Sequence, residues 1–362
     1  MMYQTSLPAR VKKQHMTELA AYKKELYRNP RLAHLFIEMT ALCNEHCIHC
    51  GSRCGDFKEE GLLSGDEIRS FLDYVKKNFP IDRLQLCITG GEPLLRKDFF
   101  EIMEYARFLG FAWGMTSNGI LITPEVAREL KRTGMRTVSI SVDGLGETHD
   151  WFRGREGSYE ETMTGIRNLL EVGFDHVQIT SVIHKNNIHQ LDDMYETFCK
   201  TGVRSWRAVN IEPIGRAKEH PELLFGPEEY KRLLTFIKEK RFASTMEVAY
   251  GCSHYLGTEL EREVRPWYFL CNAGIYTAAV TYNGDITACL DIERRPELVQ
   301  GNIRKDDFKT VWQDKFQVYR NDSRCTGMCK KCKEYKYCGG DSFHTWDFDK
   351  NEPGVCLKGI LF

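Results

Sequence analysis

Three cysteines near the start of the chain have the spacing of a metal-ligating loop. Cys43, Cys47 and Cys50 form a Cys-x3-Cys-x2-Cys triplet directly after the apolar run at residues 35–37. Thiolates are soft ligands, and iron-sulfur clusters are held by them. Because three thiolates leave the fourth iron of a 4Fe-4S cube without a protein ligand, a substrate or cofactor could bind that iron. The triplet therefore predicts a cluster that does chemistry on a bound molecule.

A zinc knuckle is the alternative interpretation of the same loop. In that case His46 and His49, which lie between the cysteines, could be zinc ligands. Zinc sites usually pair Cys-x2-Cys elements and close with four ligands, which this triplet does not do. A zinc-ribbon interaction module without catalysis is the corresponding functional alternative. We expect Cys54 to be an unligated thiol near the cluster.

A second group of cysteines marks the C-terminal part of the chain. Eight of the 14 cysteines fall within residues 252–362. The first residues lack the apolar core of a secretory signal, so we expect a cytoplasmic protein, and cytosolic thiols bind metals more often than they form disulfides. These candidate metal ligands are Cys252, Cys271, Cys289, Cys325, Cys329, Cys332, Cys338 and Cys356.

Charge and hydropathy limit the class of partner. Lys and Arg total 50 and Asp and Glu total 51, so net charge gives no reason to expect nucleic acid or an anionic membrane surface. No apolar run approaches the roughly 18 residues that a membrane span needs. We therefore expect neither nucleic acid nor a membrane as a partner.

Six short, β-rich apolar runs alternate with amphipathic helical segments and would position the first cysteine loop. Paired residues predict helix starts at Ser64 with Glu67, Asp98 with Glu101, and Ser158 with Glu161, and Thr123 before Pro124 predicts another. Such alternation requires a parallel sheet with right-handed crossovers. The predicted strands are residues 35–40, 84–89, 112–117, 137–142, 176–182 and 206–212.

Six such units in an α/β chain favour a partial (βα)6 TIM-like barrel over a doubly wound open sheet. Every predicted strand is followed by a polar or Gly-rich segment, which gathers the chemistry at the carboxyl ends of the strands. We expect an N-terminal helical segment (1–34), the barrel (35–217), a helical connector (218–251) and a small iron-sulfur domain (252–362).

With the glycine-rich turn after the second strand, the cysteine loop resembles the signature of the radical S-adenosylmethionine (SAM) superfamily. Gly90, Gly91 and Glu92 stand where family members hold the methionine amino group of SAM. The resemblance implies that SAM binds the open iron through its amino and carboxylate groups. One electron from the cluster would then cleave SAM to a 5'-deoxyadenosyl radical.

Further SAM contacts are implied by the same resemblance. The ends of the third and fourth strands look like the family segments around the SAM carboxylate and ribose, and they carry Ser117, Asn118, Ser141 and Asp143. Arg153 is our candidate for the SAM carboxylate, because a fixed positive fork suits that group. The alternative is that Arg153 caps the following loop and Ser141 is an ordinary strand residue.

The C-terminal cysteine series resembles the SPASM extension of radical SAM enzymes, which carries two auxiliary 4Fe-4S clusters. The resemblance assigns Cys329, Cys332, Cys338 and Cys356 to the second auxiliary cluster, and Cys271 and Cys289 to the first. Ser342 stands where the family has a further cysteine. We expect Cys325, and after it Cys252, to complete the first cluster. The alternative is that both are free thiols and that this cluster is absent or has an open iron.

The resemblance also implies a substrate class. A ribosomally made peptide or a protein side chain is expected, modified by a crosslink, thioether, epimerisation or oxidation. The alternative is a small metabolite such as a tetrapyrrole or aminoglycoside precursor. It gains weight because the 34 residues before the first predicted strand are too few for a leader-binding winged helix. A flavodoxin or ferredoxin is expected to supply the electron.

Overall fold

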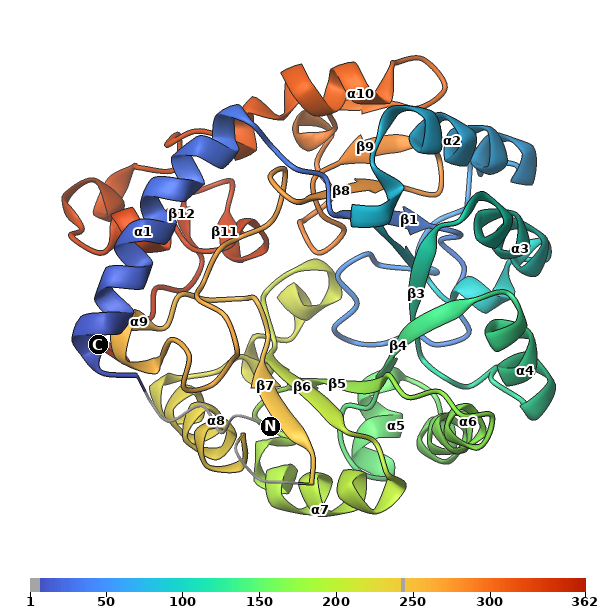
Figure 1. The fold of residues 1–362 in the computed structure, drawn as a ribbon. Helices are drawn as coiled ribbons and strands as arrows, with labels where there is room; N and C mark the ends of the chain where they lie inside the picture. The colour runs from blue at the N-terminus through green and yellow to red at the C-terminus, as the bar shows by residue number, and fades with distance from the viewer. Residues whose placement is uncertain (1–6, 242–244) are drawn as a thin grey trace.

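One curved sheet organises the molecule. The computed structural model describes residues 7–241 and 245–362. Its main sheet has ten strands in the order β10-β9-β8-β1-β2-β3-β4-β5-β6-β7, and helices lie along the outer face (Figure 1). The inner face lines a cavity instead of packing against a second helix layer. This confirms the α/β fold with a partial barrel and excludes the doubly wound alternative.

All six predicted strands are present, and a seventh continues the parallel series. β7 pairs with β6 inside residues 218–251, where the sequence predicted only a helical connector. Its buried Val248 and Tyr250 alternate with more exposed residues, a pattern too short to be recognised beforehand. The parallel strands are β1 (His34–Glu38), β2 (Gln85–Thr89), β3 (Ala112–Ser117), β4 (Met135–Ser141), β5 (Val177–Ile183), β6 (Ser205–Asn210) and β7 (Glu247–Tyr250).

The main hydrophobic core lies between the outer face of the sheet and the helices. In β1, for example, Leu35 and Ile37 are buried on the helix side, whereas His34 and Phe36 line the cavity. This alternation follows from the two-residue period of a strand. The surrounding helices are α2 (Gly65–Asn78), α3 (Phe99–Leu109), α4 (Pro124–Arg132), α5 (Glu147–Arg153), α6 (Ser158–Glu171), α7 (Leu191–Thr201) and α8 (Pro227–Lys240).

Two of the four predicted helix caps form. Ser64 and Glu67 make a reciprocal capping box on α2, and the Thr123 side chain caps α4. Asp98 precedes α3 without a side-chain cap and instead pairs with Arg96 at 2.7 Å. Ser158 is the first residue of α6, and its hydroxyl donates to Glu45. Those two predictions were wrong because Asp98 pairs with the nearby Arg96 and Ser158 with the distant Glu45.

The C-terminal region extends the barrel sheet. β8 (Thr277–Val280) lies parallel to β1, and β9 (Asp285–Thr287) returns antiparallel through a turn at Gly284. β10 (Gly301–Asn302) completes this edge. The remaining short elements are α9 (Gly257–Leu260), α10 (Phe308–Thr310), α11 (Tyr335–Cys338), β11 (Trp346–Asp347) and β12 (Glu352–Pro353).

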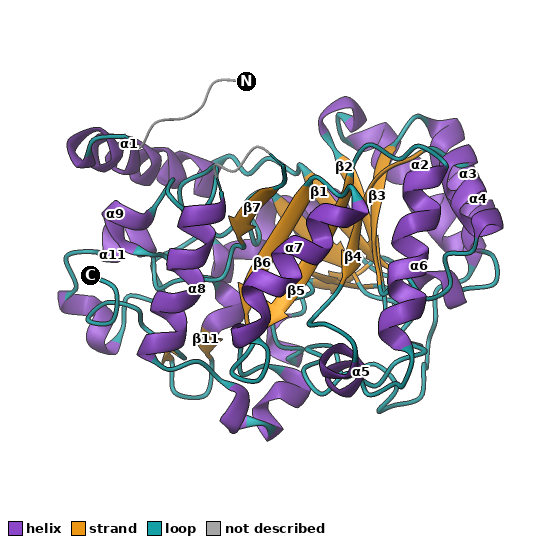
Figure 2. Ribbon diagram, turned by 90° about the horizontal axis from the view of Figure 1, so that it is seen from below, coloured by secondary structure: helices purple, strands orange, loops and turns teal. Residues whose placement is uncertain are grey.

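The N-terminal helix α1 (Ala9–Arg28) lies beside α9 and α11 (Figure 2). Lys12 forms a buried ion pair with Glu263 and donates to the carbonyl of Glu259 at 2.7 Å. His15 and Tyr22 on the same helix line the cavity. Helix α1 therefore packs on the C-terminal region and closes part of the cavity wall. Among the described residues, no helix has the length and apolar character needed to cross a membrane.

Candidate functional site

A cavity of about 1910 Å³ runs along the inner face of the sheet. Its wall includes residues from all seven parallel strands, from α1 and from the C-terminal region. Two sets of cysteines line it, one from the loop after β1 and one from the C-terminal region, and Cys87 on β2 lines it as well. The lining cysteines are Cys43, Cys47, Cys50, Cys54, Cys87, Cys252, Cys271 and Cys289.

The loop after β1 is held by backbone contacts from α5 and by one arginine. The amides of His46 and Ile48 donate to the carbonyls of Arg153 and Phe152, at 3.2 and 3.1 Å. Arg216 is buried, and its guanidinium donates to the carbonyls of Cys47 and Cys54, at 2.7 and 3.1 Å. Arg216 therefore fixes the shape of the cysteine loop, a role that sequence alone did not reveal.

Glycines let two other turns approach this loop closely. A Cβ atom on Gly91 would stand 2.0 Å from the carbonyl oxygen of Leu42. Gly215 has a positive φ of 54°, and a Cβ atom there would stand 2.2 Å from the carbonyl oxygen of Cys50. The predicted Gly90-Gly91 pair thus packs on the cysteine loop, and both of its residues also line the cavity.

The thiols of the loop have different environments. Burial raises the pKa of Cys47 well above its usual value and raises that of Cys43 to about 11. The pKa of Cys50 is lowered to about 5, because the Cys54 thiol donates a hydrogen bond to its sulfur. Cys54 is therefore a hydrogen-bond partner of a ligand candidate, and its expected position beside a cluster stays a prediction. Iron binding would have to displace the protons of Cys43 and Cys47.

Arg153 links the cysteine loop to the end of β4. Its guanidinium lies 2.7 Å from Asp143 Oδ2, 3.4 Å from Glu45 Oε2 and 3.6 Å from Cys47 Sγ. Burial lowers the pKa of Arg153, but the charges of Asp143, Cys47 and Glu45 outweigh this effect and keep it well above the usual value. Asp143 and Arg153 thus lie beside the cysteine loop. The positive charge of Arg153 interacts with Asp143, Glu45 and Cys47.

The other predicted SAM contacts divide into lining and supporting residues. Ser117, Asn118 and Ser141 line the cavity. Glu92 is fully buried and is not part of the lining; its carboxylate accepts from the Ser117 hydroxyl and the Asn118 amide, each at 3.0 Å. Burial raises the pKa of Glu92 to about 7. Glu92 therefore positions the turn after β3, and its direct contact with SAM stays a prediction.

The residues present fit an iron-sulfur cluster with bound SAM. Three soft thiols of one loop line the cavity, and the Arg153 cation lies 3.6 Å from Cys47 Sγ, close enough to stabilise its thiolate. Within the described part of the chain, the buried Nε of Arg153 has no hydrogen-bond partner, which leaves a donor for a carboxylate. No group of three or more His, Cys, Asp or Glu side chains there is arranged around a single metal ion.

Sequence reasoning missed Glu45 and the role of His49. Glu45 lies between Cys43 and Cys47, so its place in the motif was the available signal. His49 stacks on Phe152 with ring centroids 4.0 Å apart, and burial keeps its pKa well below the usual value, so that the imidazole is neutral. His46, the other zinc-ligand candidate, is mostly exposed and faces Asp56 at 3.7 Å.

The C-terminal thiols have two sets of electrostatic neighbours. The pKa of Cys289 is raised by burial and also by the neighbouring Cys252 and Cys271. Burial raises the pKa of Cys329 to about 11, and the thiols that add to this effect are Cys356, Cys332 and Cys325. Cys325 is thus an electrostatic neighbour of Cys329, whereas we expected it to complete the first cluster. The ligation itself stays a prediction.

Cys338 is the last residue of α11, and Ser342 lies in the loop that follows. The Asp341 amide donates to Cys338 Sγ at 3.0 Å. The hydroxyl of Ser342 donates to the carbonyl of Ser253 at 2.5 Å, and Ser342 also lines the cavity. Ser342 therefore supports the loop through its own hydrogen bond at the position where a cysteine was expected.

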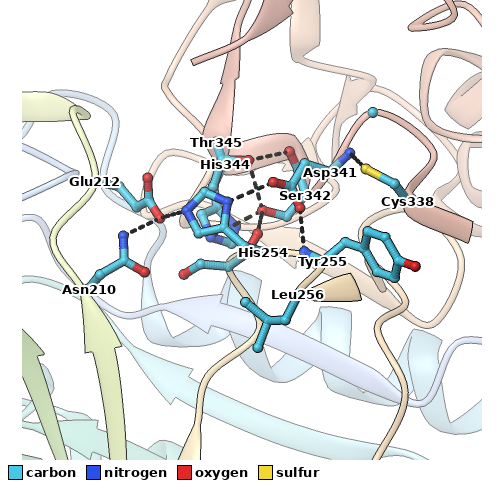
Figure 3. A network of polar contacts seen from close by, with 12 residues as sticks. Asn210, Glu212, His254, Tyr255, Leu256, Cys338, Asp341, Ser342, His344 and Thr345 are labelled. Carbon is cyan, nitrogen blue, oxygen red and sulfur yellow. Dashed lines mark hydrogen bonds and ion pairs between the residues drawn. The ribbon is translucent and has the colours of Figure 1, made fainter. Parts of the chain in front are cut away.

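A buried polar network connects this loop to the end of β6 (Figure 3). His254 lies between Glu212 Oε1, at 2.8 Å, and Asp341 Oδ2, at 2.6 Å. Burial alone would lower the pKa of His254, but the charges of Glu212 and Asp341 raise it to about 10. Asn210 donates to Glu212 at 2.9 Å. The protonated imidazole thus joins the barrel to the loop that carries Cys338.

Comparisons with known proteins agree with this geometry. The family model described as the radical SAM superfamily matches residues 37–198, and the SPASM model, described as an iron-sulfur cluster-binding domain, matches residues 271–333. An AdoMet-dependent heme synthase of Methanosarcina barkeri is 30% identical over 337 residues, which cover 87% of this chain and 94% of that protein. A mycofactocin maturase of Mycolicibacterium smegmatis is 29% identical, over 84% of this chain and 76% of its own length.

Solved structures show the same fold. SuiB of Streptococcus suis bound to S-adenosylmethionine has a TM-score of 0.71 at 18% identity, with 88% of this chain and 75% of that chain covered. The structure of anSMEcpe with bound AdoMet and a peptide has a TM-score of 0.69 at 20% identity, with 88% and 90% covered. The barrel and the C-terminal region are thus found together in both.

Proposed function

This chain belongs to the radical SAM superfamily and carries a SPASM domain, and on that premise we propose that it oxidises a substrate held in the barrel cavity. The observation behind this proposal is that the Cys43 loop and the group of Cys252, Cys271 and Cys289 line the same cavity. A substrate between them would lie within reach of both a radical source and an electron acceptor.

The cofactors of the family are 4Fe-4S clusters and SAM. Held by Cys43, Cys47 and Cys50, a cluster with SAM would supply radical chemistry that removes a hydrogen atom from a substrate carbon. A cluster held by the C-terminal cysteines would supply an acceptor for the second electron. Arg216 and the turns at Gly91 and Gly215 hold the cysteine loop in place for this chemistry. Arg153 offers its free Nε to the SAM carboxylate, and the cavity wall holds the substrate carbon in position.

Two substrate classes follow from the relatives. The mycofactocin maturase supports a ribosomally made peptide, the class that the sequence predicted. A tetrapyrrole is the second candidate, because the named heme synthase matches over nearly its whole length and another relative is an Fe-coproporphyrin III synthase of M. barkeri, 27% identical over 84% of this chain and 81% of that protein. A cavity of about 1910 Å³ is large enough for either ligand.

Anaerobic turnover tests the proposal. The protein with its clusters, SAM and a flavodoxin or ferredoxin as electron donor should form 5'-deoxyadenosine. With Fe-coproporphyrin III, or with short peptides encoded beside this gene, one substrate should be consumed as 5'-deoxyadenosine accumulates, and deuterium at the reacting carbon should appear in the 5'-deoxyadenosine. A colourless protein that contains zinc and no labile sulfide would end the proposal. SAM cleavage without product from any added compound would contradict the proposed substrate classes.

A further inference from the structure

Arg207 is an arginine in the inner wall of the barrel. Strand β6 alternates, so that Trp206 and Ala208 are buried on the helix side whereas Arg207 and Val209 line the cavity. The residue opposite Arg207 on β5 is Thr180, and the one on β7 is Ala249. The guanidinium therefore projects from the middle of a strand whose cross-strand neighbours carry no charge.

The charge of Arg207 is not compensated by the protein. Within the described part of the chain, Arg207 makes no hydrogen bond and no ion pair, whereas Arg153 in the same cavity is held by Asp143 and Glu45. Cys252 lies beside this part of β6, because the amide of its neighbour Gly251 donates to the carbonyl of Ala208 at 3.1 Å. An arginine side chain stays protonated at any physiological pH. A permanent cation thus faces the cavity close to the C-terminal cysteine group.

The position of Arg207 limits which anion it can bind. A guanidinium presents two parallel N–H donors that match one carboxylate. A phosphate group carries more charge and is commonly bound by several donors or cations together, while the neighbours of Arg207 on β5 and β7 are Thr180 and Ala249. A single carboxylate is therefore the group that this site fits best.

We propose that Arg207 binds a carboxylate of the substrate, so that the enzyme acts on a molecule that carries a free carboxylate. This inference rests on the proposed function. Arg207 lies in the middle of β6, whereas the cysteine loop lies at the carboxyl ends of the strands. A carboxylate bound to Arg207 therefore anchors the substrate deep in the cavity and leaves its reacting carbon toward Cys43, Cys47 and Cys50. Such an anchor selects among substrates without taking part in hydrogen transfer.

Both candidate classes can supply this group, and matched pairs of probes distinguish them. Fe-coproporphyrin III carries four carboxylates, and its tetramethyl ester has the same ring without them. A short peptide with a free C-terminal carboxylate is matched by its C-terminal amide. Binding to the anaerobic protein with its clusters is measured from the porphyrin absorption and, for peptides, by calorimetry.

The wild-type protein should bind one acid at least about tenfold more tightly than its neutral partner, because only the carboxylate forms an ion pair with the guanidinium. Arg207→Gln should abolish that preference, and Arg207→Lys should keep part of it. Arg136→Gln is the control, since Arg136 is exposed on β4 and lies outside the cavity lining. Inorganic phosphate should not compete.

The proposal is overturned if wild-type protein binds neither acid, binds an acid and its neutral partner equally, or keeps its preference in Arg207→Gln. Formation of 5'-deoxyadenosine without substrate is measured in parallel. If the wild-type protein forms no 5'-deoxyadenosine, the proposed function is wrong. The binding comparison tests the role of Arg207 independently of that result. Arg136→Gln, at an exposed residue outside the cavity lining, should leave this background SAM cleavage unchanged.

Discussion

The loop at residues 43–54 and the cysteines of the C-terminal region supply the same type of ligand atom, but the chain fixes them differently. In the loop, contacts from α5, Arg216 and two glycine turns hold a short segment, and Cys47 and Cys54 are buried. In the C-terminal region, thiols come from separate short turns, and Cys252 and Cys356 are exposed. Local spacing thus sets the first site, whereas long-range packing sets the second.

The largest expected effect comes from removing the first thiol set. Changing Cys43, Cys47 and Cys50 together to Ala should abolish 5'-deoxyadenosine formation, because no soft ligands remain in the loop. Iron bound by the C-terminal cysteines should persist, since that region has its own ligands. The measurements are SAM cleavage and iron content, with Cys199→Ala on α7 as the control. Unchanged cleavage in the triple variant would remove the central claim.

The next prediction concerns how the C-terminal thiols are shared. In the triple variant, Cys325→Ala and Cys356→Ala should each release the same set of roughly four irons, and combining them should release no more. Cys252→Ala should affect the other set, because Cys252 lies with Cys271 and Cys289. Iron counting with Mössbauer or EPR spectra distinguishes the sets. If Cys325→Ala and Cys252→Ala affect one common set, the grouping expected from the sequence is right and the structural one is wrong.

Much of the fold was readable because local signals agreed with one another. The six predicted strands, the Ser64–Glu67 capping box and the Thr123 cap all form. The seventh strand was missed because four residues give too short a pattern. The two wrong caps failed because other groups bind the side chains. Arg96, two residues before Asp98, forms an ion pair with it, and Glu45, far away in sequence, accepts from Ser158.

The site was predictable only where spacing carried the information. The Cys43 loop could be read directly, since its ligand candidates lie within eight residues. The buried organisers of that loop could not, because Arg216 reaches it from a segment more than 150 residues away and has no motif of its own for this role. The same reasoning applies to Cys325, whose neighbours depend on how several turns pack.

A third prediction tests the buried ion pairs of His254, which connect the end of β6 to the C-terminal region. His254→Gln leaves Glu212 and Asp341 buried without their shared cation, which should destabilise the protein by about 3 to 5 kcal/mol. Unfolding of the anaerobic protein by denaturant measures this loss. A change below about 1 kcal/mol would show that the ion pairs contribute little. SAM cleavage by the remaining folded protein should continue, since His254 does not contact the Cys43 loop.

The stability that the His254 ion pairs contribute should decrease as pH rises. The pKa of His254 is about 10 in the folded state, against roughly 6.5 for an unperturbed histidine. The folded state therefore binds the proton more tightly, and its stabilising contribution is complete below about pH 6.5 and is lost as pH rises toward 10. Wild-type stability should fall across this window more steeply than that of His254→Gln. Parallel curves would contradict the assignment of the proton to His254.

The smallest expected effect concerns Arg304, which forms a partly exposed contact between the C-terminal region and the start of α2. Arg304 donates to Glu67 Oε1 at 2.5 Å and to the carbonyl of Gly61 at 2.9 Å. Because these groups are partly exposed, solvent screens the pair, and Arg304→Ala should cost at most about 1 kcal/mol. The Ser64 cap still holds the start of α2. The difference from wild type should shrink in 1 M salt, and the exposed Arg83→Ala serves as control. If Arg304→Ala lost as much stability as His254→Gln, burial would not explain the difference expected between these two contacts.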